Sequence, residues 1–85
     1  MDRSQVAVVI PAHNEASTIA RMVEGVSAFG IPIVVDDASQ DGTGSLAASA
    51  GAFVIRMELN GGYDRALDMG FQEADRLGTD FVITI

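Results

Sequence analysis

The sequence contains no cysteine, no tryptophan and no lysine, and its only firmly basic residues are five arginines. The absence of cysteine excludes disulfides, thiolate metal sites and thiol nucleophiles, and it fits a reducing compartment. We therefore expect a cytoplasmic location, either free or at the cytoplasmic face of a membrane.

Positive charge is scarce, because twelve acidic residues against five basic ones give a net charge of −7. Such a field repels the phosphates of nucleic acids and anionic lipid headgroups. A long hydrophobic run is also missing: the longest, from Val6 to Ala12, is too short to span a bilayer. We expect no nucleic-acid partner, no targeting signal and no direct membrane insertion by this segment.

The chain does have a globular composition, with 48% hydrophobic and 20% charged residues. Its 85 residues form one small domain at most, since a complete globular unit usually has roughly 100–200. The composition argues against wholesale disorder, and the length excludes a two-domain enzyme.

Three repeats of a short apolar run, a polar turn and a helically spaced stretch indicate the order β-α-β-α-β-α-β. The runs are apolar at consecutive positions, which is typical of parallel strands buried on both faces by helices. The candidate strands are Gln5–Ile10, Ile31–Val35, Ala52–Met57 and Thr79–Ile85.

Three helices are expected between these strands. The first follows Asn14 as its N-cap and stops at Gly30; the second covers residues 43–50, and the third covers residues 63–77. A glycine inside the third helix, Gly70, predicts close packing against a strand, since it costs about 1 kcal/mol relative to alanine. The residues expected to face the sheet are Ile19, Met22, Val23 and Val26, then Leu46, Ala47 and Ala50, then Tyr63, Ala66, Leu67, Gly70, Ala74 and Leu77.

Right-handed crossovers restrict this order to a Rossmann-like open parallel sheet, most simply with strand order 3-2-1-4. Ligands of such sheets bind beyond the carboxyl ends of the strands, where the order reverses. The last run, Phe81–Ile85, has the character of a buried strand, yet no turn or helix follows it. We therefore expect residues 1–85 to be a single domain segment, incomplete at its C-terminus.

The second strand leads into an acidic loop with Asp36 and Asp37 at the predicted binding edge. Two adjacent carboxylates raise the cost of keeping each other ionised, so each needs a partner: a base or ribose donor, a cation or backbone amides. Ser39 and Asp41 are better explained as turn and cap residues. A calcium loop fails because Ala48 stands where its glutamate belongs, and a dinucleotide fingerprint beginning at residue 42 is a weak match.

Two further loops lie at the same edge. After the first strand come Pro11, Ala12, His13 and Glu15, which can end a strand and open a helix without any ligand. Their position opposite the two aspartates favours a functional role instead. After the third strand, residues 60–62 form either an ordinary turn or an anion cradle, provided that their backbone amides are free.

The order and spacing of these motifs resemble the N-terminal part of family 2 glycosyltransferases, most closely the branch with dolichyl-phosphate mannose synthases. The resemblance spans nearly all of the chain and about the first third of that family's catalytic domain. It rests on Val8-Val9-Ile10-Pro11-Ala12-His13-Asn14-Glu15, on Ile33-Val34-Val35-Asp36-Asp37-Ala38-Ser39 with Asp41-Gly42-Thr43, and on Asn60-Gly61-Gly62 ahead of Ala66 and Gly70.

The resemblance implies a GT-A fold that binds a UDP- or GDP-linked sugar and transfers the sugar to a lipid phosphate or saccharide acceptor. Transfer would proceed by displacement at the sugar C1, with a metal and helix-end amides stabilising the departing diphosphate. Pro11, Ala12, His13 and Glu15 would line the nucleotide pocket, Asp37 would accept from the base, and Asp36 would support the loop. Asn60, Gly61 and Gly62 would shape the floor near the phosphates.

In that family the strand equivalent to Phe81–Ile85 runs into an Asp-x-Asp motif that holds Mg²⁺ or Mn²⁺. By this comparison the metal ligands and the general base are absent from this chain, so we expect it to be inactive alone and to bind no metal tightly.

Two alternatives belong to other classes. A non-catalytic α/β module could self-associate through the apolar edge of the last strand. A response-regulator-like or nucleotidyltransferase-like domain also carries acidic residues at strand ends, but the former needs an aspartate where this chain has Arg56-Met57-Glu58.

Overall fold

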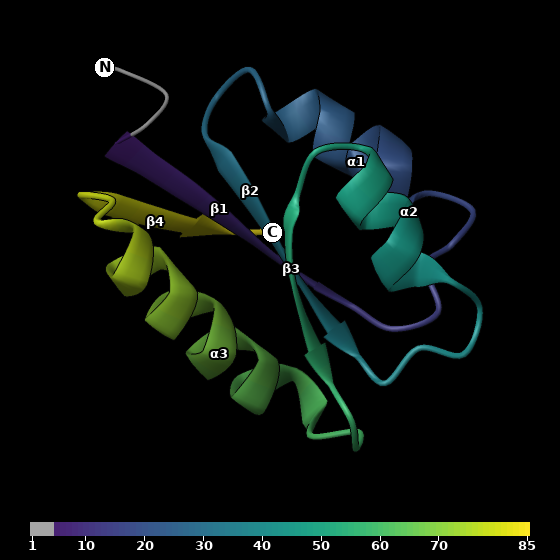
Figure 1. Cartoon of the computed structure of the whole chain (residues 1–85). Helices are drawn as coiled ribbons and strands as arrows, with labels where there is room; N and C mark the ends of the chain where they lie inside the picture. Colours follow the sequence, from purple (N-terminus) through teal and green to yellow (C-terminus); the bar gives the residue numbers. More distant parts are fainter. Residues whose placement is uncertain (1–4) are drawn as a thin grey trace.

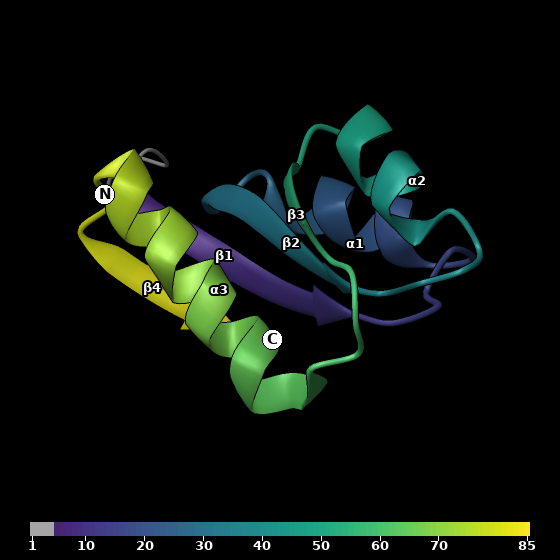
Figure 2. The same cartoon turned by 60° about the horizontal axis from the view of Figure 1, so that its bottom comes forward.

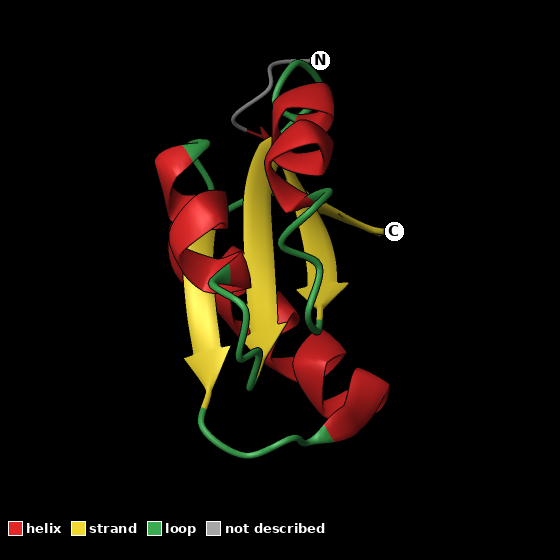
Figure 3. Cartoon of the chain, turned by 90° about the vertical axis from the view of Figure 1, so that its right-hand side faces the viewer, coloured by secondary structure: helices red, strands yellow, loops and turns green. Residues whose placement is uncertain are grey.

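The computed structural model describes residues 5–85, in which four parallel strands alternate with three helices (Figure 1). The sheet has the order β3-β2-β1-β4, and Figure 3 shows its strands as arrows of one direction. Both the predicted order of elements and the predicted strand order are confirmed. The elements are β1 Val6–Ala12, α1 Ile19–Val26, β2 Ile31–Asp37, α2 Thr43–Ser49, β3 Phe53–Met57, α3 Gly62–Leu77 and β4 Phe81–Thr84.

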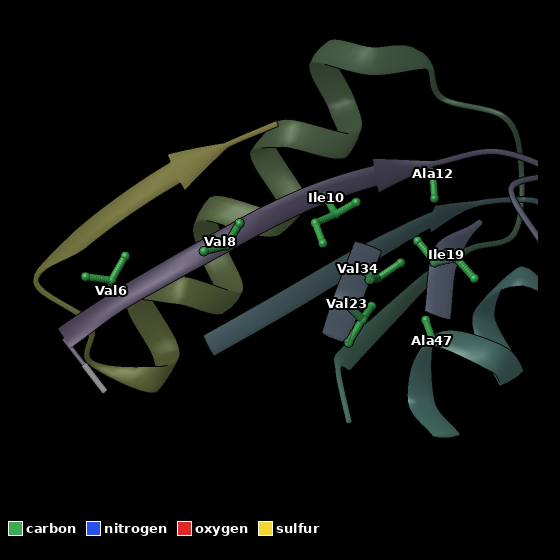
Figure 4. Packing of buried hydrophobic residues seen from close by; sticks show 8 residues of the cluster. All are labelled: Val6, Val8, Ile10, Ala12, Ile19, Val23, Val34 and Ala47. Atoms are coloured by element: carbon green, nitrogen blue, oxygen red, sulfur yellow. The ribbon is translucent and has the colours of Figure 1, made fainter. Parts of the chain in front are cut away.

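Helices cover both faces of the two central strands. Even-numbered residues of β1 pack with Ile19 and Val23 of α1 and Ala47 of α2, as Figure 4 shows. Odd-numbered residues of β1 face α3, whose Ala66 and Ala74 lie against them; Figure 2 shows α3 across this second face. Burying a side chain such as Ile19 contributes about 1.5–3 kcal/mol. Because the side chains of β1 point alternately to the two faces of the sheet, their burial stabilises the packing of the helices on both faces.

The prediction of burial on both faces holds for β1 and β2 but is wrong for the outer strands. Phe53 of β3 is 45% exposed, and all four residues of β4 are exposed. The reason is position, since β3 and β4 form the two edges of the sheet and each pairs with one neighbour only within residues 5–85. Apolar composition alone does not separate an edge strand from a central one.

The first helix begins at Ile19, so Asn14 is not its N-cap. Asn14 instead has φ of +55°, and Thr18 precedes the helix without a side-chain capping bond. Glu15 therefore lies before the helix, where its backbone oxygen accepts from the amides of Thr18 and Ile19 at 3.0 and 2.9 Å. The stripe of α1 itself is as predicted, with Ile19 and Val23 buried.

Two large side chains expected in the core lie outside it. Leu46 is 42% exposed because Thr43 and Ala47, one turn apart, form the buried side of α2. Tyr63 is 59% exposed, since the buried stripe of α3 starts only at Ala66. Across residues 5–85, every helix falls short of the length and apolar character that crossing a bilayer requires.

Gly70 confirms the predicted close approach of α3 to the sheet. A β-carbon added at this position would overlap the Cγ1 atom of Val9 in β1. Gly25 in α1 is the opposite case, with no heavy atom within 4 Å of an added β-carbon.

We predict that Gly70→Ala destabilises the fold by about 1–3 kcal/mol, because overpacking forces Val9 or the helix to move. Gly25→Ala is the matched control and should stabilise the chain by up to about 1 kcal/mol through helix propensity. Urea denaturation followed by circular dichroism measures both effects. An equal stabilisation by the two substitutions would contradict the close contact.

Candidate functional site

The loop after β1 and the end of β2 meet at the carboxyl edge of the sheet. The register pairs Ala12 of β1 with Asp36 of β2, which places the two strand ends side by side. His13 follows directly, and its Nδ1 atom lies 2.6 Å from the backbone oxygen of Asp37. Residues 11–15, which comprise the end of β1 and the loop after it and are called the proline corner here, therefore converge with Asp36 and Asp37 at this edge, as the sequence predicts.

The two neighbouring aspartates serve opposite faces of the sheet, because successive side chains of a strand alternate. Asp36 points toward α2, where its Oδ2 atom would lie 2.7 Å from a β-carbon added at Gly44. Asp37 points toward the start of α3, where it accepts from backbone amides. The adjacent carboxylates therefore do not share one ligand site.

Asp36 is only 1% exposed, and protein groups satisfy it. Its Oδ1 atom accepts from the amide of Ser39 at 3.0 Å, and its Oδ2 atom accepts from Nη1 of Arg56 at 2.8 Å. The same guanidinium donates from Nη2 to the backbone oxygen of Ser39 at 2.9 Å. Sequence reasoning missed Arg56, although it stands directly beside Asp36 in the parallel register.

Asp37 links the end of β2 to the first turn of α3. It is 7% exposed, and its two carboxylate oxygens accept from the amides of Gly61 and Gly62 at 2.9 and 3.1 Å. The amide of Gly62 also donates to Oδ1 of Asn60 at 3.2 Å. The anion cradle proposed for this loop required free amides, and that condition is not met for these two, because Asp37 takes the place of an external anion.

Side chains of the loop after β2 hold the backbone of the loop after β1. The amides of residues 14–16 donate in turn to Ser39 Oγ at 2.8 Å, Thr43 Oγ1 at 2.9 Å and Asp41 Oδ2 at 3.1 Å. These bonds fix the backbone of residues 14–16, and Asn14 has a φ of +55° instead of the extended backbone of an N-cap.

Contacts with Asp37 and Asn14 set the orientation of the His13 ring. Asn14 Oδ1 accepts from the backbone amide of Gln40 at 2.9 Å. This bond orients the side chain of Asn14 so that its Nδ2 atom faces the ring of His13. That Nδ2 atom lies 3.3 Å from Nε2 of His13. With Nδ1 donating to the oxygen of Asp37, Nε2 is the acceptor, so both ring nitrogens are occupied.

A cleft of about 230 Å³ lies where these loops meet α3. Five of the nine predicted binding residues line it, together with two that sequence reasoning did not assign to the site. The lining residues are Pro11, Ala12, His13, Glu15, Asp37, Tyr63 and Ala66. Its charged side chains are two carboxylates, and no arginine of residues 5–85 lines it.

The other four predicted residues lie elsewhere around this edge. Asp36 belongs to the opposite face of the sheet, and Gly62 contributes an amide to Asp37. Asn60 and Gly61 line a separate groove of about 560 Å³ beside α3. In the described part of the chain, no three His, Asp or Glu side chains group closely enough to hold a metal ion.

The pKa of Asp41 in this network is lowered from its ordinary value. The hydrogen bond from the Thr43 hydroxyl lowers the pKa of Asp41 most, and the amides of Ala16 and Thr43 lower it further. Desolvation acts in the opposite direction but does not reverse the shift.

The parallel sheet, its helical layers and a cleft beyond the strand ends define a Rossmann-like α/β protein of the GT-A type. The chain belongs to glycosyl transferase family 2, whose family model matches residues 7–85.

Individual proteins and solved structures are similar to this chain. The uncharacterized protein MJ1222 of Methanocaldococcus jannaschii is 33% identical over 86 residues, which cover 99% of this chain and 35% of that protein. The crystal structure of mannosyl-3-phosphoglycerate synthase from Rubrobacter xylanophilus is 34% identical, with a TM-score of 0.57 over 61% of this chain and 19% of its own. A structure described as a mycobacterial protein is 29% identical, with a TM-score of 0.64 over 74% of this chain and 25% of its own. The chain thus spans about a third of the length of the curated relative it matches.

We predict that Asp41 stabilises the fold at neutral pH and loses this effect in acid. A carboxylate with a lowered pKa in the folded state contributes stability above its unfolded pKa, near 3.9, and loses it as the pH falls through the folded value. Thermal unfolding from neutral pH into acid should show Asp41→Asn less stable than the parent at pH 7, with the gap closing below about pH 4.

The control is Asp75→Asn on the exposed surface of α3, because the side chain of Asp75 makes no hydrogen bond or ion pair within residues 5–85. It should change stability little at any pH. A gap between the parent and Asp41→Asn that stays constant into acid would show that the carboxylate does not hold the loop.

Proposed function

We propose that residues 1–85 form the nucleotide-sugar-binding segment of a glycosyltransferase, which transfers a sugar from a UDP- or GDP-linked donor to a lipid phosphate or saccharide acceptor. The observation that carries this proposal is the convergence of the proline corner and Asp37 on one cleft at the carboxyl edge of the sheet. Membership of glycosyl transferase family 2 supports sugar transfer as the reaction. A solved relative named as a mannosyl-3-phosphoglycerate synthase supports it as well.

The chemistry of the cleft supports binding of the nucleotide through its base. The carboxylates of Glu15 and Asp37 repel phosphate groups but accept hydrogen bonds from the N–H groups of a nucleobase. Asp37 is held in place by two amides, so it meets a ligand with little reorganisation. The diphosphate and the sugar would then extend out of the cleft toward solvent.

The proposal includes a dependence of the full reaction on a divalent metal ion. A divalent cation would offset the repulsion between a diphosphate and the carboxylates of the cleft. The described residues do not fit this role, since they contain no suitable group of ligands. We therefore propose that residues of the larger glycosyltransferase domain outside residues 5–85 bind the metal. The lack of cysteine supports a cytoplasmic location.

We predict that the chain binds UDP or GDP and that Asp37→Asn weakens this binding roughly ten- to hundred-fold, in line with about 1.5–3 kcal/mol for a hydrogen bond to a charged group. Isothermal titration calorimetry measures the affinities. Mn²⁺ should change these affinities little, because residues 5–85 lack grouped metal ligands and the diphosphate extends out of the cleft, away from its carboxylates.

The control for this experiment is Glu24→Gln, an exposed carboxylate on α1 outside the cleft. Circular dichroism before each titration ensures that Asp37→Asn is folded, because the substitution also removes a partner of the amides of Gly61 and Gly62. Failure of the folded parent chain to bind either nucleotide would reject the proposal.

A second candidate function follows from β4, whose edge position is visible in Figure 1. Phe81, Val82 and Ile83 are 53%, 41% and 50% exposed, and an apolar strand at a sheet edge recruits other strands. In this alternative the chain is a non-catalytic module that self-associates through β4.

Sedimentation velocity over a range of concentrations tests the alternative. Self-association through β4 predicts a dimer at high concentration that Ile83→Lys abolishes, because a charged residue on an edge strand opposes pairing. A parent chain that stays monomeric throughout would remove this candidate and would leave the nucleotide-binding proposal untouched.

A further inference from the structure

Tyr63 is a large aromatic side chain that the core does not use. It lies one helical turn before Ala66, which is 1% exposed and packs against the sheet, so the two residues are on the same side of α3. Tyr63 is nevertheless 59% exposed and lines the cleft instead. Burial in the core therefore does not account for an aromatic residue at this position.

Hydrogen bonds fix the position of Tyr63 relative to the floor of the cleft. The amides of Gly61 and Gly62, directly before it, donate to the two oxygens of Asp37. The same carboxylate lines the cleft and holds the first turn of α3. Tyr63 and the Asp37 carboxylate thus form two walls of the cleft, and the carboxylate accepts from the backbone directly before Tyr63.

The remaining walls suit a flat, uncharged ring with N–H donors. Pro11, Ala12 and Ala66 supply apolar surface, and the charged groups are acceptor carboxylates. With about 230 Å³, the cleft is smaller than the ~300–1,000 Å³ usual for a whole drug-sized ligand. It can take one ring system of a nucleotide sugar, and its charge disfavours the phosphate end.

We propose that Tyr63 stacks on the base of the bound nucleotide and supplies affinity that requires the presence of a base. This inference rests on the proposed function and adds a binding residue to it. Stacking tolerates any base, because every base has a π face, so Tyr63 contributes to affinity for nucleotides rather than to the choice between uracil and guanine.

The composition of the chain provides a direct optical test. Tyr63 is its only tyrosine and there is no tryptophan, so intrinsic tyrosine fluorescence reports on this one ring. UDP and GDP should change the fluorescence of Tyr63 with the same midpoint that calorimetry gives for binding. Inorganic pyrophosphate, which lacks a base, should leave the fluorescence unchanged.

Variants separate stacking from other effects. Tyr63→Leu should weaken UDP and GDP binding about ten-fold or more and leave any pyrophosphate binding unchanged, whereas Tyr63→Phe should retain nucleotide affinity. Phe29→Ala removes an aromatic residue that is 72% exposed and lies outside the cleft, and it should have no effect. Because Tyr63 is exposed, Tyr63→Leu should also unfold at the same temperature as the parent.

Three results would overturn the inference. Nucleotide binding without a change in Tyr63 fluorescence, and with full affinity in Tyr63→Leu, would reject stacking while the proposed function stands. An equal loss of UDP and pyrophosphate binding in Tyr63→Leu would assign the residue to the phosphates instead. Absence of nucleotide binding by the folded parent would reject the proposed function and this inference together.

Discussion

The carboxylate of Asp37 is the contact on which the organisation of this edge depends. Asp37 is the last residue of β2, and its carboxylate accepts from two amides at the start of α3. Its backbone oxygen faces His13 of the loop after β1. Three segments far apart in the sequence thus converge on one residue. Since Asp37 is nearly buried, losing its negative charge would leave two amides without a strong acceptor, and the walls of the cleft would lose their common anchor.

Sequence patterns predict the central part of the fold well. Consecutive apolar residues in β1 and β2 require cover on both faces, and only helices on either side of a parallel sheet supply it. Gly70 in the third helix correctly indicates contact with Val9, because a larger residue has no room there. The meeting of Pro11 and Asp37 at one edge follows from topology alone, since all parallel strands end on the same side.

The predictions from the sequence fail where long-range contacts override local preference. Asn14 is a good N-cap by type, but its amide is bonded to Ser39 of the loop after β2, its φ is +55° instead of extended, and α1 begins only at Ile19. The sequence does not predict the contact of Arg56 with Asp36, because that contact depends on the register between β2 and β3, which apolar periodicity does not fix. β4 has the residues of a buried strand and is nevertheless an exposed edge, because position in a sheet is a property of the whole fold.

The order of the strands also has a consequence for how the chain folds. β1 pairs with β2 on one side and with β4 on the other, so Val6 meets Phe81 from nearly the opposite end of the polypeptide. Closing that loop costs more conformational entropy than joining β1 to β2, and nothing local compensates for it before α3 has docked. Assembly should therefore proceed outward from β1, β2 and their helices, and the last strand should add late and detach first.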